Sequence, residues 1–81
     1  MNPNGILWTV EDVMAALGCG KRTVHGLTGS RSIPCRRLPH SRRILFMPAE
    51  VVAWVDSGGS LALEVDDLPG GGFVVRPKEL A

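Results

Sequence analysis

The most distinctive chemical feature of this sequence is a block of positive side chains that contains no acid. Residues 21–43 hold seven cations and no aspartate or glutamate, although the net charge of the chain is only +1. Unmixed lysine and arginine bind phosphate oxygens, so the block predicts a polyanionic partner. A solvated basic face without a ligand is the simpler alternative. The seven cations are Lys21, Arg22, Arg31, Arg36, Arg37, Arg42 and Arg43.

A second set of side chains could bind a metal ion. It consists of Cys19, His25, Cys35 and His40. Structural zinc sites place their ligands in close pairs, as Cys-x2–4-Cys and His-x3–5-His, and this chain has neither spacing. We therefore expect no metal, no cofactor and two reduced thiols.

Enzyme chemistry is not indicated. The glycines at positions 70–72 precede an apolar run, but they lack the lysine and hydroxyl residue of a phosphate-binding loop. Asp66 and Asp67 are typical of a solvated turn, and no nucleophile stands beside a base. We expect a non-enzymatic protein with no catalytic residues and no small-molecule substrate.

The sequence shows no targeting signal. Its start lacks a basic region followed by an apolar one, and no apolar run approaches the roughly 20 residues that span a bilayer. We expect a soluble protein in the cytoplasm, without a membrane partner.

Two short helices are predicted to position the first cations. Thr9 and Asp12 form a capping pair for a helix over residues 10–17, and Gly18 ends it. A second helix should cover residues 21–28 and begin on Lys21 and Arg22. Two helices joined by a tight glycine-containing turn are typical of a helix-turn-helix, whose second helix enters the DNA major groove.

The outward face of the second helix follows from its core residues. With Val24 and Leu27 inward, a rotation of about 100° per residue turns His25 and Gly26 outward. Gly26 costs roughly 1 kcal/mol in a helix interior. It is either a tolerated defect or a site where the backbone approaches another surface. The candidate DNA-binding residues of this helix are Lys21, Arg22, Thr23, His25 and Thr28.

A basic two-stranded wing is predicted next. Residues 35–38 and 43–47 are strand candidates, and residues 39–42 form the turn between them. We expect Leu38, Ile44 and Phe46 to face the core, although a shift of one residue would exchange the two faces. The candidate DNA-binding residues of the loop and wing are Arg31, Arg36, Arg37, His40, Ser41, Arg42 and Arg43.

The predicted fold is mainly α with a small β-hairpin, an α+β winged helix-turn-helix of three short helices. Residues 1–6 are expected to be a loose end, and residues 7–57 the DNA-binding domain with a third helix that starts at Pro48. Residues 58–81 are expected to be a linker and tail. A short hairpin and an extended arm are both open for the tail. Its deletion from residue 60 is expected to leave DNA binding by one copy nearly intact.

Residues 7–55 resemble the excisionase family of winged helix-turn-helix proteins, which are recombination directionality factors related to the MerR DNA-binding domain. Gly20, Gly26, Gly29 and Arg31 depart from the family pattern. The resemblance rests on Trp8-Thr9-Val10-Glu11-Asp12-Val13, Leu17-Gly18, Lys21-Arg22-Thr23-Val24, Ile33-Pro34, the arginine hairpin ending in Phe46, and Glu50-Val51-Val52-Ala53-Trp54-Val55.

The resemblance implies a DNA-binding protein of a phage or prophage. Such proteins bind double-stranded DNA cooperatively beside an attachment site, bend it and direct an integrase toward excision. The implied partners are double-stranded DNA, an integrase and neighbouring copies of the chain. About five phosphate contacts would give a slope of about −4 to −5 for log K against log salt. The alternatives are a small phage or plasmid transcriptional regulator and a protein-interaction module that uses the acidic tail.

Overall fold

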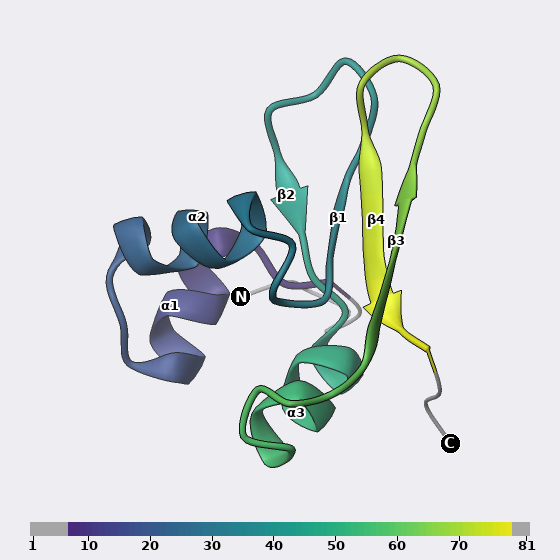
Figure 1. The fold of residues 1–81 in the computed structure, drawn as a ribbon. Coiled ribbons are helices and arrows are strands. Elements are labelled where there is room, and N and C mark those ends of the chain that lie inside the picture. The colour runs from purple at the N-terminus through teal and green to yellow at the C-terminus, as the bar shows by residue number, and fades with distance from the viewer. Residues whose placement is uncertain (1–6, 79–81) are drawn as a thin grey trace.

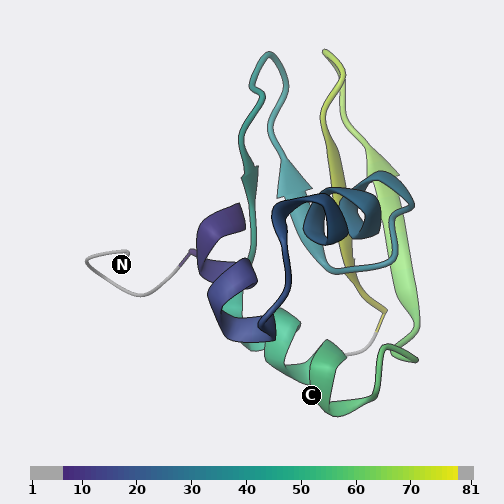
Figure 2. The same cartoon turned by 90° about the vertical axis from the view of Figure 1, so that its left-hand side faces the viewer.

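A computed structural model describes residues 7–78 and places three helices against one four-stranded sheet. This confirms the predicted α+β class of three helices with a wing; the end expected at residues 1–6 lies outside the described residues. Helix α2 crosses one face of the sheet, and α3 lies at one end of it (Figures 1 and 2). The elements in order are α1 (Val10–Leu17), α2 (Lys21–Gly29), β1 (Cys35–Arg37), β2 (Ile44–Leu45), α3 (Pro48–Asp56), β3 (Leu63–Asp67) and β4 (Phe73–Pro77).

The helix-turn-helix forms as its local sequence predicts. The Thr9 backbone N–H donates to the Asp12 carboxylate at 2.9 Å, and the Asp12 backbone N–H donates to the Thr9 hydroxyl at 3.3 Å. This capping box satisfies two backbone donors that the first turn of α1 would otherwise leave unpaired. Gly18 ends the helix with φ of 66°, a conformation that favours glycine.

The tail forms a hairpin and joins the wing in one sheet. The strand order is β2-β1-β4-β3, and every neighbouring pair is antiparallel. We define the wing as β1, β2 and the loop 38–43 between them. The sequence predicted a wing of two strands only. In the structure, β4 pairs with the other edge of β1, so the wing is part of a four-stranded sheet. Of the two alternatives for the tail, the structure has the hairpin.

The register of β1 differs from the expected one. Arg37 lies opposite both Ile44 and Phe73, so these three side chains share the face of the sheet that carries the core. Leu38, the next residue, therefore turns to the other side and is 51% exposed. The expectation that Leu38 faces the core was wrong, by the shift of one residue that exchanges the faces of a strand.

The core joins residues from all parts of the chain. Val13 of α1, Val24 of α2 and Val51 of α3 are buried together with Phe46, the largest fully buried side chain. Two reciprocal backbone hydrogen bonds between Trp8 and Phe46, at 2.8 and 2.9 Å, tie the start of α1 to the end of the wing. The tail hairpin adds Phe73 and Val75 to the same cluster.

Candidate nucleic-acid interface

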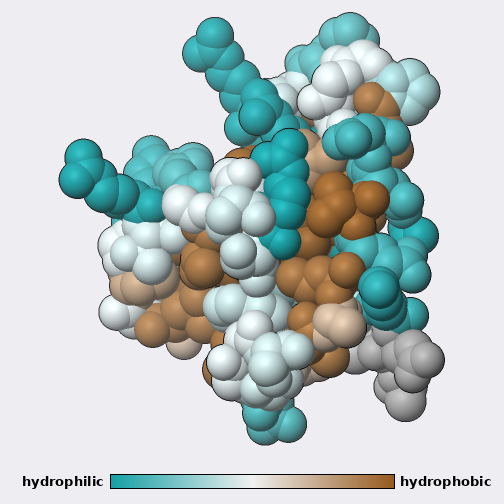
Figure 3. All heavy atoms as spheres, viewed as in Figure 1, coloured by the Kyte–Doolittle hydropathy of each residue, from teal (hydrophilic) through white to brown (hydrophobic). Residues whose placement is uncertain are grey.

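An open polar concavity lies between the helix-turn-helix and the wing, with a volume of about 230 Å³. Two of its lining residues, Lys21 and His25, come from α2, and two others, Arg42 and Arg43, come from the wing loop. We call this concavity the basic groove. Hydrophilic side chains project from the α2 side of the molecule and from the sheet end that bears the wing loop (Figure 3). The remaining lining residues are Thr9, Val10, Glu11 and Ile44.

Helix α2 begins on cations that its own electrostatics disfavour. Lys21 and Arg22 stand in its first turn, where the positive end of the helix dipole repels them. The N-cap is Gly20, which provides no side-chain hydrogen bond, and the first turn holds no acid. An anion at this end would interact favourably with the free backbone N–H groups and with both cations. Lys21, Arg22, Thr23 and His25 are all exposed, so α2 presents them to a ligand.

Local hydrogen bonds fix the shape of the wing loop. Arg37 donates from Nε to the Ser41 carbonyl at 3.3 Å, and the Arg43 backbone N–H donates to the Ser41 hydroxyl at 3.1 Å. His40 adopts a left-handed backbone with φ of 61°. Arg42 and Arg43 are exposed beyond this turn. Ser41 and Arg37 therefore shape the loop that positions the two arginines.

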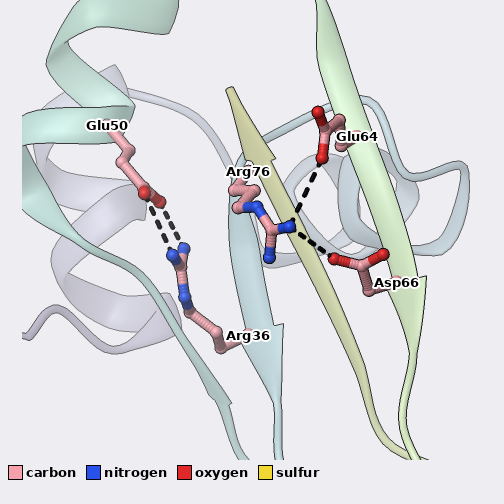
Figure 4. Close-up of polar contacts among 5 residues, drawn as sticks. All are labelled: Arg36, Glu50, Glu64, Asp66 and Arg76. Carbon is pink, nitrogen blue, oxygen red and sulfur yellow. Dashed lines mark hydrogen bonds and ion pairs between the residues drawn. The ribbon is translucent and has the colours of Figure 1, made fainter. Parts of the chain in front are cut away.

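Thr28 and Arg36 were predicted to bind DNA, but in the structure both side chains have partners within the protein. Thr28 is 2% exposed, and its hydroxyl donates to the His25 carbonyl at 3.1 Å, because this side of α2 faces the core. Arg36 forms a two-pronged ion pair with Glu50 of α3, with one N–O distance of 3.0 Å. Because Arg36 precedes the core-facing Arg37, it lies on the opposite face of the sheet, as do Arg76 and its partners Glu64 and Asp66 (Figure 4).

Arg31 packs within the protein. Its guanidinium carbon lies 3.8 Å from the centroid of the Phe73 ring, and its Nη1 donates to the Gly29 carbonyl at 3.0 Å. The backbone of Arg31 is left-handed, with φ of 57°, which explains why the resembled family favours glycine at this position. Here an arginine accepts that conformation and stacks on the tail hairpin, a contact worth about 0.5–2 kcal/mol.

One residue of the basic groove was not predicted from the sequence. Glu11 lines the basic groove beside Lys21 and Arg43, although it lies outside the acid-free block of residues 21–43. Glu11 lies in the first turn of α1, where an acid interacts favourably with the helix dipole. This effect alone accounts for an acid at that position, without any role in the groove. Nothing in its sequence spacing indicates the groove. In the folded protein, one carboxylate therefore lies among the cations of the basic groove.

The cysteines and histidines lie on four separate segments. Cys19 is in the turn after α1, His25 on α2, Cys35 on β1 and His40 in the wing loop. Cys35 is fully buried, and burial raises the pKa of its thiol to about 11, so it stays protonated at neutral pH. Across residues 7–78, no group of three potential His, Cys, Asp or Glu ligands is arranged to hold a metal ion.

These features define a winged helix-turn-helix domain with a basic groove. A family model described as a helix-turn-helix domain matches residues 9–59, and the chain belongs to this family of DNA-binding domains. The match covers α1, α2, the wing and α3, and it leaves out the β3–β4 hairpin. No curated protein and no solved structure matches the chain. Within residues 7–78, no helix is long and apolar enough to cross a membrane.

Proposed function

We propose that this protein binds double-stranded DNA in a sequence-specific manner through α2 and the wing. The observation that supports this most strongly is the basic groove, where Lys21 and His25 of the helix meet Arg42 and Arg43 of the wing. Two elements separated in sequence thus offer positive charge to one side of a ligand. A helix in the major groove with an adjacent wing matches that geometry.

The residues of this surface have separate proposed roles. Lys21, Arg42 and Arg43 bind phosphates and supply affinity without sequence preference. Arg22 and His25, exposed on α2, read base edges, since arginine recognises guanine in the major groove. Thr23 on α2 and His40 in the wing loop are also exposed. Because Thr28 is buried, the set of base readers is smaller than the sequence suggested.

We further propose an excisionase role, on the resemblance of residues 7–55 to that family. The protein would bind cooperatively beside a phage attachment site in the bacterial nucleoid, and direct a tyrosine integrase toward excision without performing chemistry itself. Bending a site of 20–30 base pairs costs roughly 1–6 kcal/mol. A single small domain with two base-reading side chains offsets little of this, so several neighbouring copies are expected to share the cost.

Two experiments test this function in sequence. Selection of bound duplexes from a random-sequence pool, followed by footprinting, is expected to return one motif in tandem copies; recovery of random sequence would refute specific binding. A two-plasmid recombination assay with a cognate integrase is then expected to show excision that depends on this protein. Specific binding without any effect on excision would favour a transcriptional regulator on the same fold.

Replacing Gly26 with alanine is expected to stabilise the protein and weaken its binding to DNA. A Cβ atom at Gly26 meets nothing within 4 Å in the free protein, so the helix should gain about 1 kcal/mol. The same methyl group would hold the α2 backbone away from a bound duplex. The measurements are thermal unfolding and the Kd for duplex DNA.

Gly29→Ala is the matched control for this prediction. Gly29 is the last residue of the same helix, one turn beyond Gly26 and farther from the cations of the first turn, and it also has open space around it. This variant should bind DNA like the wild type. Unchanged affinity of Gly26→Ala would show instead that its backbone does not approach DNA.

A further inference from the structure

The loop between β3 and β4, residues 68–72, lies beside the wing loop. Phe73 is opposite both Arg37 and Asp67 in the last pairs before the two loops, so both loops leave the sheet at the same end. Figures 1 and 2 show the two loops side by side there, at the end of the molecule away from α3. We call residues 68–72 the hairpin loop. It lies outside the matched family region of residues 9–59.

The two loops are packed so closely that glycine is required at the contact. A Cβ atom on Gly70 would lie 2.9 Å from His40 Nε2 and 3.0 Å from Pro39 Cβ. A Cβ atom on Gly72 would lie 2.7 Å from the backbone nitrogen of Pro39. Because the neighbours of Gly72 are backbone atoms, a side chain at this position would separate the loops, and a side chain at Gly70 would displace the His40 ring. The wing loop and the hairpin loop thus form one composite tip.

The hairpin loop has its own fixed geometry. The Gly71 N–H donates to the Leu68 carbonyl at 3.3 Å, which closes a turn with Pro69 and Gly70 at its centre. Gly70 has φ of 88°, as the third residue of a type II turn requires. The Leu68 N–H donates to the Gly72 carbonyl at 2.8 Å and closes the base of the loop. The loop is therefore a preformed surface.

The charge of the hairpin loop suits approach to a polyanion. Residues 68–72 contain no ionisable side chain, and Gly70, exposed at the centre of the turn, allows the backbone to come close to a phosphate oxygen. In β3, two residues before the loop, Asp66 is paired with Arg76 at 2.8 Å. Asp67, directly before the loop, is exposed, and its carboxylate would oppose a bound phosphate.

We propose that the hairpin loop is a second DNA-contacting element, which binds the sugar-phosphate backbone beside the strand segment that the wing loop contacts. This inference rests on the proposed function of the wing. If the wing loop reaches DNA through Arg42 and Arg43, a loop in van der Waals contact with His40 and Pro39 lies at the same surface. With the hairpin loop, the protein would then cover more of the DNA backbone than a two-stranded wing alone.

Charge substitution at Pro69 tests this inference. Pro69 is exposed in the turn, and both Pro69→Lys and Pro69→Glu remove the same proline, so their effect on folding is shared. On a random-sequence duplex, the ratio of Kd for the glutamate variant to that for the lysine variant is expected to be on the order of tenfold at low salt. The lysine variant should also steepen the slope of log K against log salt by about 0.9.

Ala62 provides the matched control. It is exposed at the opposite end of the same hairpin, and it is the residue directly before β3. Ala62→Lys and Ala62→Glu are expected to differ less than twofold, on the order of a remote, screened charge. Equal ratios at positions 62 and 69 would overturn the inference. If the wild type itself failed to bind duplex DNA, the proposed function would be wrong instead, so the two failures are distinguishable.

Discussion

Val75→Ala is expected to destabilise the protein by about 2 kcal/mol, although Val75 lies in the tail hairpin. Val75 is fully buried on β4, the strand between β1 and β3. The substitution removes two buried methyl groups and leaves a cavity beside Cys35, its partner across the β1–β4 pair. Such a loss is a large part of the total stability of a domain this small. Thermal and urea unfolding measure it.

Val65→Ala is the matched control. Val65 lies directly opposite Val75 on β3 but is 45% exposed, so its replacement should cost less than about 0.5 kcal/mol. Equal effects of the two substitutions would contradict the placement of the tail hairpin.

The same burial changes the expectation for the tail as a whole. We propose that residues 60–78 belong to one folding unit with the helix-turn-helix. Deletion of residues 60–81 would remove Phe73 and Val75 from the core and expose the edge of β1. We therefore expect the truncated chain to unfold, where the sequence alone suggested a separable tail. A truncated protein that unfolds cooperatively near the wild-type melting temperature would show that the tail is dispensable.

The double variant Arg42→Ala/Arg43→Ala is expected to weaken duplex binding by on the order of tenfold or more at low salt. Both side chains are exposed and line the basic groove, and they form no ion pair within residues 7–78. On the proposed function, their removal takes two phosphate contacts from the wing, and neither side chain belongs to the core. Fluorescence anisotropy with a labelled duplex measures the change in Kd.

Arg76→Ala is the control for this pair. Arg76 is exposed on the other face of the sheet and paired with Glu64 and Asp66, so its loss acts on DNA only through remote, screened charge and should weaken binding much less than the double variant does. An effect of Arg76→Ala as large as that of the double variant would indicate that DNA binds the face of the sheet that carries Arg76, which would contradict the proposed interface.

Local signals in the sequence predicted the helices well because their causes are local. The Thr9–Asp12 capping box and the Gly18 stop act within one or two turns of α1. The sheet was harder to predict, since β1 pairs with β4 across more than 30 residues of sequence, and no short-range pattern fixes that pairing. The register of β1 is likewise set by the tail, which places Phe73 opposite Arg37.

The acid-free charge block is the basis of the proposed binding surface, but three of its cations make contacts within the protein. Of the seven cations, Arg31 stacks on Phe73, Arg36 pairs with Glu50 and Arg37 holds the wing loop. Each of these contacts depends on residues distant in sequence or on the fold of a loop, so composition cannot reveal it. Four exposed cations remain for the ligand, and they are Lys21, Arg22, Arg42 and Arg43.

The salt dependence of duplex binding tests most directly whether these four cations form one DNA-binding surface. The three phosphate contacts proposed for Lys21, Arg42 and Arg43 predict a slope of about −2.7 for log K against log salt, whereas seven contacts would give about −6. We expect the measured slope to lie near the smaller magnitude, with tighter binding to duplex than to single strands of the same sequence. A slope weaker than about −1, or equal affinity for single strands, would contradict the account.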